Sequence, residues 1–99
     1  MEQKKTKKVF NDPFINVLPQ LDLHGEVADI SRVLVKNFID ENYLLGKEKV
    51  VIIHGKGTGV LKKVVHETLK ESNHVSKYST DITNDGITIV TLKPLVKNL

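Results

Sequence analysis

The chain has 99 residues, a formal net charge of +3 and no cysteine. This length is usual for a single domain with a modest core, and the lack of cysteine excludes disulfides, thiolate zinc sites and cysteine nucleophiles. No apolar run approaches the roughly 20 residues that span a bilayer, so we expect a cytoplasmic protein with no membrane partner.

The basic excess lies at the N-terminus. Residues 1–8 contain four lysines and one glutamate, whereas residues 9–99 contain 11 basic and 11 acidic side chains. Residues 1–12 lack periodicity and are predicted to be a disordered basic tail, with attraction to phosphates as the alternative reading. Residues 13–19 are apolar and lie between prolines, which predicts an extended arm rather than a helix.

The domain itself is expected over residues 20–99. Residues 20–24 alternate between apolar and polar side chains, which predicts a short strand that Gly25 ends. Helical spacing follows from Glu26 to Leu45, and Gly46 is a typical helix stop. The inward face of this helix is predicted to hold Val27, Ile30, Leu34, Phe38 and Leu45.

The second half of the chain continues the alternation of strands and helices. Residues 49–54 form a β-branched run typical of a strand buried on both faces. A glycine loop at 55–59 leads into a helix from about Val60 to Ser72, with Thr58 as the expected N-cap. Residues 75–80 predict an edge strand, Asp85-Gly86 a hairpin turn and 87–92 the last strand.

The resulting order is β-α-β-α-β-β. It predicts an α/β fold, a two-layer sandwich with a mixed four-stranded sheet, in which the first two strands are parallel. Parallel strands end at the same edge of a sheet, and ligands bind at that edge in open α/β folds. Asp22 and His24 are two residues apart and His54 ends the second strand, so we expect these three side chains to converge.

The loop between residues 55 and 59 contains three glycines. It is not a Walker A sequence, because the required G-x-x-x-x-G-K-[ST] spacing is absent. Backbone N–H groups in such a turn, together with the helix N-terminus, can bind an anion. The candidate phosphate-binding residues are Gly55, Lys56, Gly57, Thr58, Gly59 and Lys62. The alternative is that the glycines only permit a tight turn.

Each candidate catalytic residue also has a structural reading. Asp22 could accept loop N–H groups, His24 could be buried against a carbonyl, and His54 could cap the adjacent loop. His66 and His74 are expected to be surface residues without a role.

The sequence "LDLHG", followed by "HGKGTG" and "DGITIVTL", resembles the Smr (small MutS-related) domain over about residues 20–93. No ATPase or clamp region precedes it, so we expect the stand-alone bacterial type. The family's D-L-H sequence falls on residues 22–24 and its H-G-x-G sequence on residues 54–57. The glycine-rich stretch usual before the last strand is shortened here to "TNDG".

The resemblance implies a nucleic-acid-binding endonuclease that nicks DNA or cleaves RNA, with messenger RNA at stalled ribosomes as one candidate substrate. Asp22, His24 and His54 would act in acid–base catalysis, beside a loop that binds the phosphate. We expect no required cofactor and no metal-binding residues, with a divalent metal as the open alternative. The expected partner is an RNA or DNA backbone, with the ribosome as a second candidate and no small-molecule substrate. A non-catalytic nucleic-acid or ribosome binding module, or a plain interaction domain, is the alternative.

Overall fold

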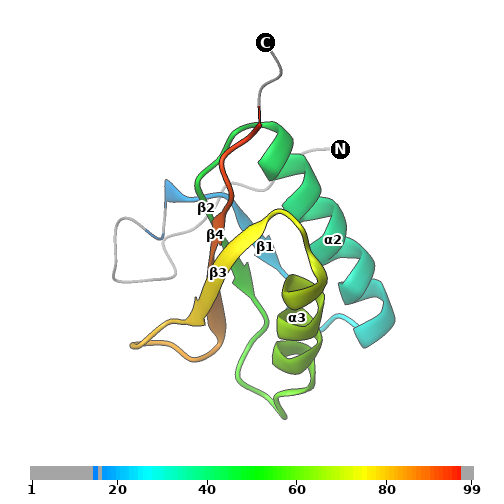
Figure 1. Ribbon diagram of the computed structural model, residues 1–99. Helices are drawn as coiled ribbons and strands as arrows, with labels where there is room; N and C mark the ends of the chain where they lie inside the picture. Colours follow the sequence, from blue (N-terminus) through cyan, green and yellow to red (C-terminus); the bar gives the residue numbers. More distant parts are fainter. Residues whose placement is uncertain (1–14, 16, 97–99) are drawn as a thin grey trace.

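A computed structural model describes residues 15 and 17–96 (Figure 1). The elements are β1 (Gln20–Asp22), α2 (Ala28–Leu44), β2 (Lys49–Ile53), α3 (Val60–Glu71), β3 (Val75–Thr80) and β4 (Ile87–Leu92). The strand order across the sheet is β1-β2-β4-β3. β1 and β2 are parallel, and the other two pairs are antiparallel. The predicted mixed sheet, the element order and the edge position of β3 are therefore confirmed, whereas the predicted tail at 1–12 lies outside the described residues.

Both helices lie on one face of the sheet, which gives the predicted two layers (Figure 1). The β-branched side chains of β2 point alternately to the two faces of the sheet. Val50 and Ile52 point into the core beneath the helices, where they meet Val35 of α2 and Val65 of α3. Val51 lies on the other face. This alternation places a strand with three buried residues, Val50, Val51 and Ile52, inside the sheet and fixes its register with β1 and β4.

The other face of the sheet is partly covered by the segment before β1. Ile15 is buried there against Val51 and Ile87. Ile15 and Val17 have helical backbone, and the Leu18 N–H donates to the Ile15 carbonyl at 3.2 Å. The predicted extended conformation is therefore wrong at these residues. Pro19 fixes its own φ and restricts Leu18 directly before it, so it leaves the backbone of Ile15 and Val17 free to be helical.

The inward face of α2 differs from the predicted one by one position. Val27 and Ile30 are exposed, as is Leu45. The fully buried residues of α2 are Ser31, Val35, Ile39 and Asn42. Leu34 and Phe38 are half-buried beside them. The helix carries apolar side chains on two adjacent rows, so the spacing alone does not identify the row that meets the sheet.

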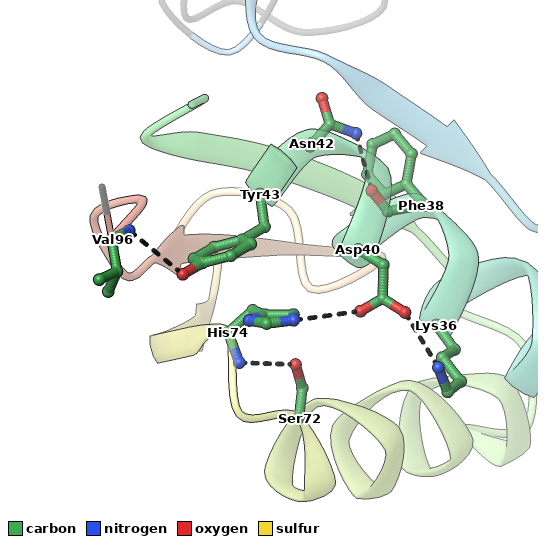
Figure 2. A network of polar contacts seen from close by, with 8 residues as sticks. All are labelled: Lys36, Phe38, Asp40, Asn42, Tyr43, Ser72, His74 and Val96. Atoms are coloured by element: carbon green, nitrogen blue, oxygen red, sulfur yellow. Dashed lines mark hydrogen bonds and ion pairs between the residues drawn. The ribbon is translucent and has the colours of Figure 1, made fainter. Parts of the chain in front are cut away.

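The C-terminal half of α2 is held to the start of β3 through His74 (Figure 2). The His74 imidazole stacks on the Tyr43 ring, with 3.8 Å between ring centroids. Its Nε2 lies 3.8 Å from Oδ1 of Asp40, and the other carboxylate oxygen, Oδ2, accepts a hydrogen bond from Lys36 at 2.9 Å. The expectation that His74 is a surface residue without a role is therefore wrong, because its ring joins two elements.

Candidate functional site

Three loops meet at the rim where β1 and β2 end (Figure 1). Parallel pairing brings the carboxyl ends of β1 and β2 together, as predicted. The third loop, residues 81–86 between β3 and β4, joins them through Gly86. The Gly86 carbonyl accepts the N–H groups of His54 and Gly55, each at 2.9 Å. The sequence indicated only a hairpin turn at this position, because nothing in "TNDG" signals contact with a distant loop.

Asp22 and His24 form the turn that follows β1. The strand ends at Asp22 instead of His24. The carboxylate of Asp22 accepts the backbone N–H of His24 at 2.9 Å, which is the structural role considered for it. Gly25 then takes the left-handed φ of +81° that reverses the chain. Asp22 therefore shapes the turn that presents His24, whose own side chain is exposed.

An open pocket of about 490 Å³ lies between this turn and the glycine loop. His24 lines it and lies beside the loop, since a β-carbon added at Gly55 would be 3.6 Å from His24 Cδ2. The rest of the lining comes mainly from residues 25–28 and 55–62. Asp22 is not among the lining residues. The structure therefore brings His24 to the glycine loop but leaves the Asp22 carboxylate outside the pocket.

The pocket is bordered by the N-termini of both helices. Val27 and Ala28 at the start of α2, and Gly59 and Val60 at the start of α3, all line it. Neither helix has a side-chain hydrogen bond from its N-cap residue. Helix N-termini carry a partial positive charge and unpaired N–H groups, which favour an anion. Two of them at one pocket make it a suitable place for a phosphate.

The glycine loop adds further unpaired donors. Within the part of the chain that the structure describes, the N–H groups of residues 56–59 donate no hydrogen bond to the protein. The N-cap of α3 is Gly59, with φ of +86°, rather than the predicted Thr58. Glycine is favoured at this position because its backbone is left-handed. The Thr58 hydroxyl lies 3.4 Å from the Val60 N–H, which is long for a hydrogen bond.

Two lysines contribute positive charge at this site. Lys62 lies in the first turn of α3 and lines the pocket, as does Lys56. The first turn of α3 contains no acidic residue. Lys56 is exposed, and its ammonium lies 4.0 Å from a carboxylate oxygen of Asp85. An exposed pair at that distance contributes little to stability, so Lys56 is available to a ligand.

His54 borders the pocket but does not face Asp22. Asp22 pairs with Ile53, whose side chain belongs to the sheet face away from the helices. The His54 ring points to the helix side, is 4% exposed and has both nitrogens engaged. Nδ1 lies 3.1 Å from the Gly55 carbonyl oxygen, and Nε2 lies 2.8 Å from the Thr88 hydroxyl. The expected convergence of Asp22 with His54 is therefore wrong, because consecutive strand residues face opposite ways.

His66 is half-buried and belongs to the same hydrogen-bonded group, although it was expected to lie on the surface without a role. Its Nε2 is 2.9 Å from the Thr88 hydroxyl, and its ring lies 4.9 Å from that of Tyr78. Burial lowers the pKa of both His54 and His66, and the charge of Lys62 adds to this effect. The sequence missed Thr88 and His66 because they are 22 residues apart and meet only where α3 crosses β4.

Across residues 15 and 17–96, no helix combines the length and the apolar character needed to cross a membrane. In the same part of the chain, no three His, Asp or Glu side chains are grouped so that they could share a metal ion.

The fold and the site define a small two-layer α/β sandwich that presents a glycine-rich loop and two helix N-termini at one rim of its sheet. Residues 21–93 match the model of the Smr domain. The chain therefore belongs to the Smr domain family, which confirms the family predicted from the sequence.

Solved structures agree with this assignment. The chain is similar to the Smr domain of Thermus thermophilus MutS2, with a TM-score of 0.75 and 28% identity, covering 78% of this chain and 100% of that one. It is also similar to YdaL, a stand-alone small MutS-related protein from Escherichia coli, with a TM-score of 0.71 and 28% identity, covering 75% and 63%.

Longer relatives carry the same domain. The chain is 38% identical over 79 residues to Endonuclease MutS2 of Halothermothrix orenii, covering 80% of this chain and 10% of that protein. It is 42% identical over 76 residues to Endonuclease MutS2 of Clostridium botulinum, covering 74% and 10%. The chain thus spans about a tenth of the length of these relatives.

Proposed function

We propose that the chain is an endonuclease that binds the backbone of a nucleic acid in the pocket beside His24. One observation carries the proposal: this pocket joins an exposed imidazole to a glycine loop and to the N-termini of α2 and α3. The first feature suits proton transfer and the others suit a phosphate. Membership of a family whose longer relatives are called endonucleases supports the same activity.

The chemistry that fits these groups is cleavage of RNA through its own 2′-hydroxyl. A base removes the proton from that hydroxyl, its oxygen attacks phosphorus, and the 5′-oxygen leaves with a proton from an acid. The products are a 2′,3′-cyclic phosphate and a free 5′-hydroxyl. His24 can serve as the base or the acid, because imidazole exchanges protons near neutral pH. Both ring nitrogens of His54 have partners within the protein, so we assign proton transfer to His24.

The other predicted residues take supporting roles. The N–H groups of the loop at 56–59 and the positive charges of Lys56 and Lys62 would stabilise negative charge that develops on the phosphate. Asp22 would act as a positioning residue, since its carboxylate holds the backbone N–H of His24. A water molecule activated by a divalent metal is the alternative chemistry, and it requires no 2′-hydroxyl.

The biological setting is a further proposal that follows from the family. We propose the cytoplasm as the location, which the absence of cysteine suits. Messenger RNA on a stalled ribosome is the candidate substrate within that compartment, and the ribosome the candidate partner.

The test is to incubate the protein with RNA and DNA of matched sequence, with and without a chelator, and to map the cut ends. We expect RNA ends that carry a cyclic phosphate, formed equally with chelator. Replacing the 2′-hydroxyl at the cut position by hydrogen should abolish that cut. Undiminished cleavage there, or its loss with chelator, would favour metal-activated water instead.

His24→Ala is the variant that assigns the chemistry. We expect it to lower the cleavage rate by about 100-fold or more, the usual effect of removing a general acid or base. Binding of RNA should remain close to that of the unaltered protein, because the loop and both helix N-termini are intact. His74→Ala is a matched control that removes an imidazole far from the pocket, and it should leave the rate unchanged.

A binding module without catalysis is the second candidate function. It is favoured by the finding that Asp22 and His54 are both engaged in internal hydrogen bonds. In that case the unaltered protein binds RNA but leaves it uncut, and log K falls linearly with log salt because phosphates are neutralised. Binding that does not depend on salt would argue against nucleic acid as the partner altogether.

A further inference from the structure

We propose that His66, Thr88 and His54 form a directed hydrogen-bond chain that holds the Gly55 carbonyl and so sets the shape of the glycine loop. His54, Thr88 and His66 are then positioning residues instead of catalytic ones. The consequence for ligand binding rests on the proposed function, whereas the hydrogen-bond chain itself does not. This hydrogen-bond chain runs from α3 through β4 to the end of β2 and links the helix to the rim of the sheet.

The direction of the chain follows from counting protons. A carbonyl oxygen only accepts, so the contact between His54 Nδ1 and Gly55 requires a proton on Nδ1. A neutral imidazole has one N–H, so His54 Nε2 is an acceptor and receives the Thr88 hydroxyl proton at 2.8 Å. The Thr88 oxygen must then accept from His66 Nε2–H at 2.9 Å. One arrangement of protons therefore satisfies every contact with both imidazoles neutral.

Burial makes this arrangement selective. Thr88 is 0% exposed, so its hydroxyl proton has no solvent partner if His54 does not receive it. Adding a proton to His54 Nε2 would place an N–H group of each imidazole against the Thr88 oxygen and leave the hydroxyl proton unpaired, unless His66 moved its own proton from Nε2 to Nδ1. An unpaired buried donor is costly. Protonation of His54 is thus opposed by the burial of its ring and by the need to reverse the hydrogen bond to Thr88, and both oppose proton exchange with a substrate.

The chain acts on the loop at its first residue. The Gly55 carbonyl accepts from His54, and the Gly55 N–H donates to the Gly86 carbonyl at 2.9 Å. Both polar groups of Gly55 are therefore held, at a φ of +78° that glycine tolerates. The free N–H groups of residues 56–59 follow directly from this held residue. Their direction depends on Gly55, and Gly55 depends on the chain.

The first experiment reads the protons themselves in the unaltered protein. Imidazole nitrogen spectra by NMR at neutral pH should show the Nδ1–H form for His54 and the Nε2–H form for His66. The opposite tautomer at either residue would overturn the direction of the chain. This measurement needs no variant, no nucleic acid and no activity, so it stands if the proposed endonuclease function fails.

The second experiment removes the central hydroxyl. Thr88→Val keeps the volume and the β-branched shape but leaves both imidazole nitrogens without a partner, whereas Thr88→Ser keeps the hydroxyl. In the free protein, we expect amide exchange at His54 and Gly55, whose N–H groups donate to the Gly86 carbonyl, to be about tenfold faster in Thr88→Val and close to unaltered in Thr88→Ser. Affinity for inorganic phosphate and for a short RNA should weaken about tenfold in the valine variant only.

These outcomes distinguish the loss of the hydrogen-bond chain from a general loss of stability. Amide exchange in β2 and α3 away from the loop reports global unfolding and serves as the internal reference. Faster exchange at the loop alone supports the chain, and unchanged loop exchange in a folded Thr88→Val protein overturns it. If Thr88→Val does not fold, the tautomers of the unaltered protein decide. If loop exchange is faster in Thr88→Val but the unaltered protein binds no RNA, the hydrogen-bond chain is supported and the proposed function is rejected.

Discussion

At the scale of single residues, glycine is required at position 86 because a larger residue would collide with its neighbours. Its φ does not lie in the left-handed region, unlike that of Gly55. A β-carbon at Gly86 would lie 3.2 Å from the Gly55 carbonyl carbon and 3.2 Å from Lys56 Cγ. The backbone of Gly55 cannot give way easily, because it is hydrogen-bonded to the Gly86 carbonyl itself. The absence of a side chain at Gly86 is what lets the β3–β4 loop contact the site.

Gly86→Ala is therefore predicted to destabilise the protein. The added methyl group forces the loops apart, at a cost of about 1–3 kcal/mol in the free energy of unfolding. Urea unfolding followed by circular dichroism measures this change. Gly57→Ala is the matched control, because nothing lies within 4 Å of a β-carbon there and its φ is not left-handed. Its free energy should stay within about 0.5 kcal/mol of the unaltered protein. Equal costs at the two positions would contradict the argument from space.

At the scale of elements, α2 contains a polar residue where it meets the core. Ser31 is 0% exposed, and its hydroxyl has no hydrogen-bond partner among the described residues. Asn42, the other buried polar residue of α2, donates to the Phe38 carbonyl at 2.9 Å. A buried hydroxyl without a partner is unfavourable. Val35 and Ile39, which follow Ser31 along the same side of α2, therefore determine which face of the helix is buried, although Ser31 lies on that face.

Ser31→Ala is predicted to stabilise the protein. Removing the unpaired hydroxyl and gaining helix propensity should raise the free energy of unfolding by about 0.5–2 kcal/mol. Thermal and urea unfolding measure the change. Ser72→Ala is the contrasting control, because the Ser72 hydroxyl accepts the His74 N–H at 3.1 Å and its loss should lower stability. A fall in stability for Ser31→Ala would mean that this hydroxyl does have a partner.

At the scale of the whole molecule, the sequence predicts the order of elements and the two loops that share one rim better than it predicts the contacts between side chains. The β-branched run of β2 and the turn residues around it are strong local signals, and parallel pairing then places residues 22–24 and 54–59 at one rim. Residue spacing does not tell which of two apolar rows of α2 is buried. Nor does it reveal that His54 turns toward the helices, because that depends on Thr88, a residue 34 positions away.

The pH dependence of stability is a property of the same buried group. Burial lowers the pKa of His54, against the hydrogen bond to the Gly55 carbonyl, which raises it; Lys62 lowers it further and Asp85 raises it. Burial also lowers the pKa of His66, and the positive charges of His54, Lys62 and Lys70 add to this effect. An unfolded histidine has a pKa of about 6.5. Below that value the unfolded chain binds more protons than the folded one, so stability falls as pH falls.

We therefore expect full stability above about pH 6.5 and a progressive loss below it, as far as the lowered pKa values of the folded state. His66→Gln isolates one contribution, since the glutamine amide can still donate to Thr88 and cannot titrate. Urea midpoints measured between about pH 8 and pH 5 should fall less steeply in His66→Gln than in the unaltered protein. Equal slopes would mean that His66 takes up its proton as readily in the folded chain as in the unfolded one, and that the hydrogen bond to Thr88 does not keep its ring buried.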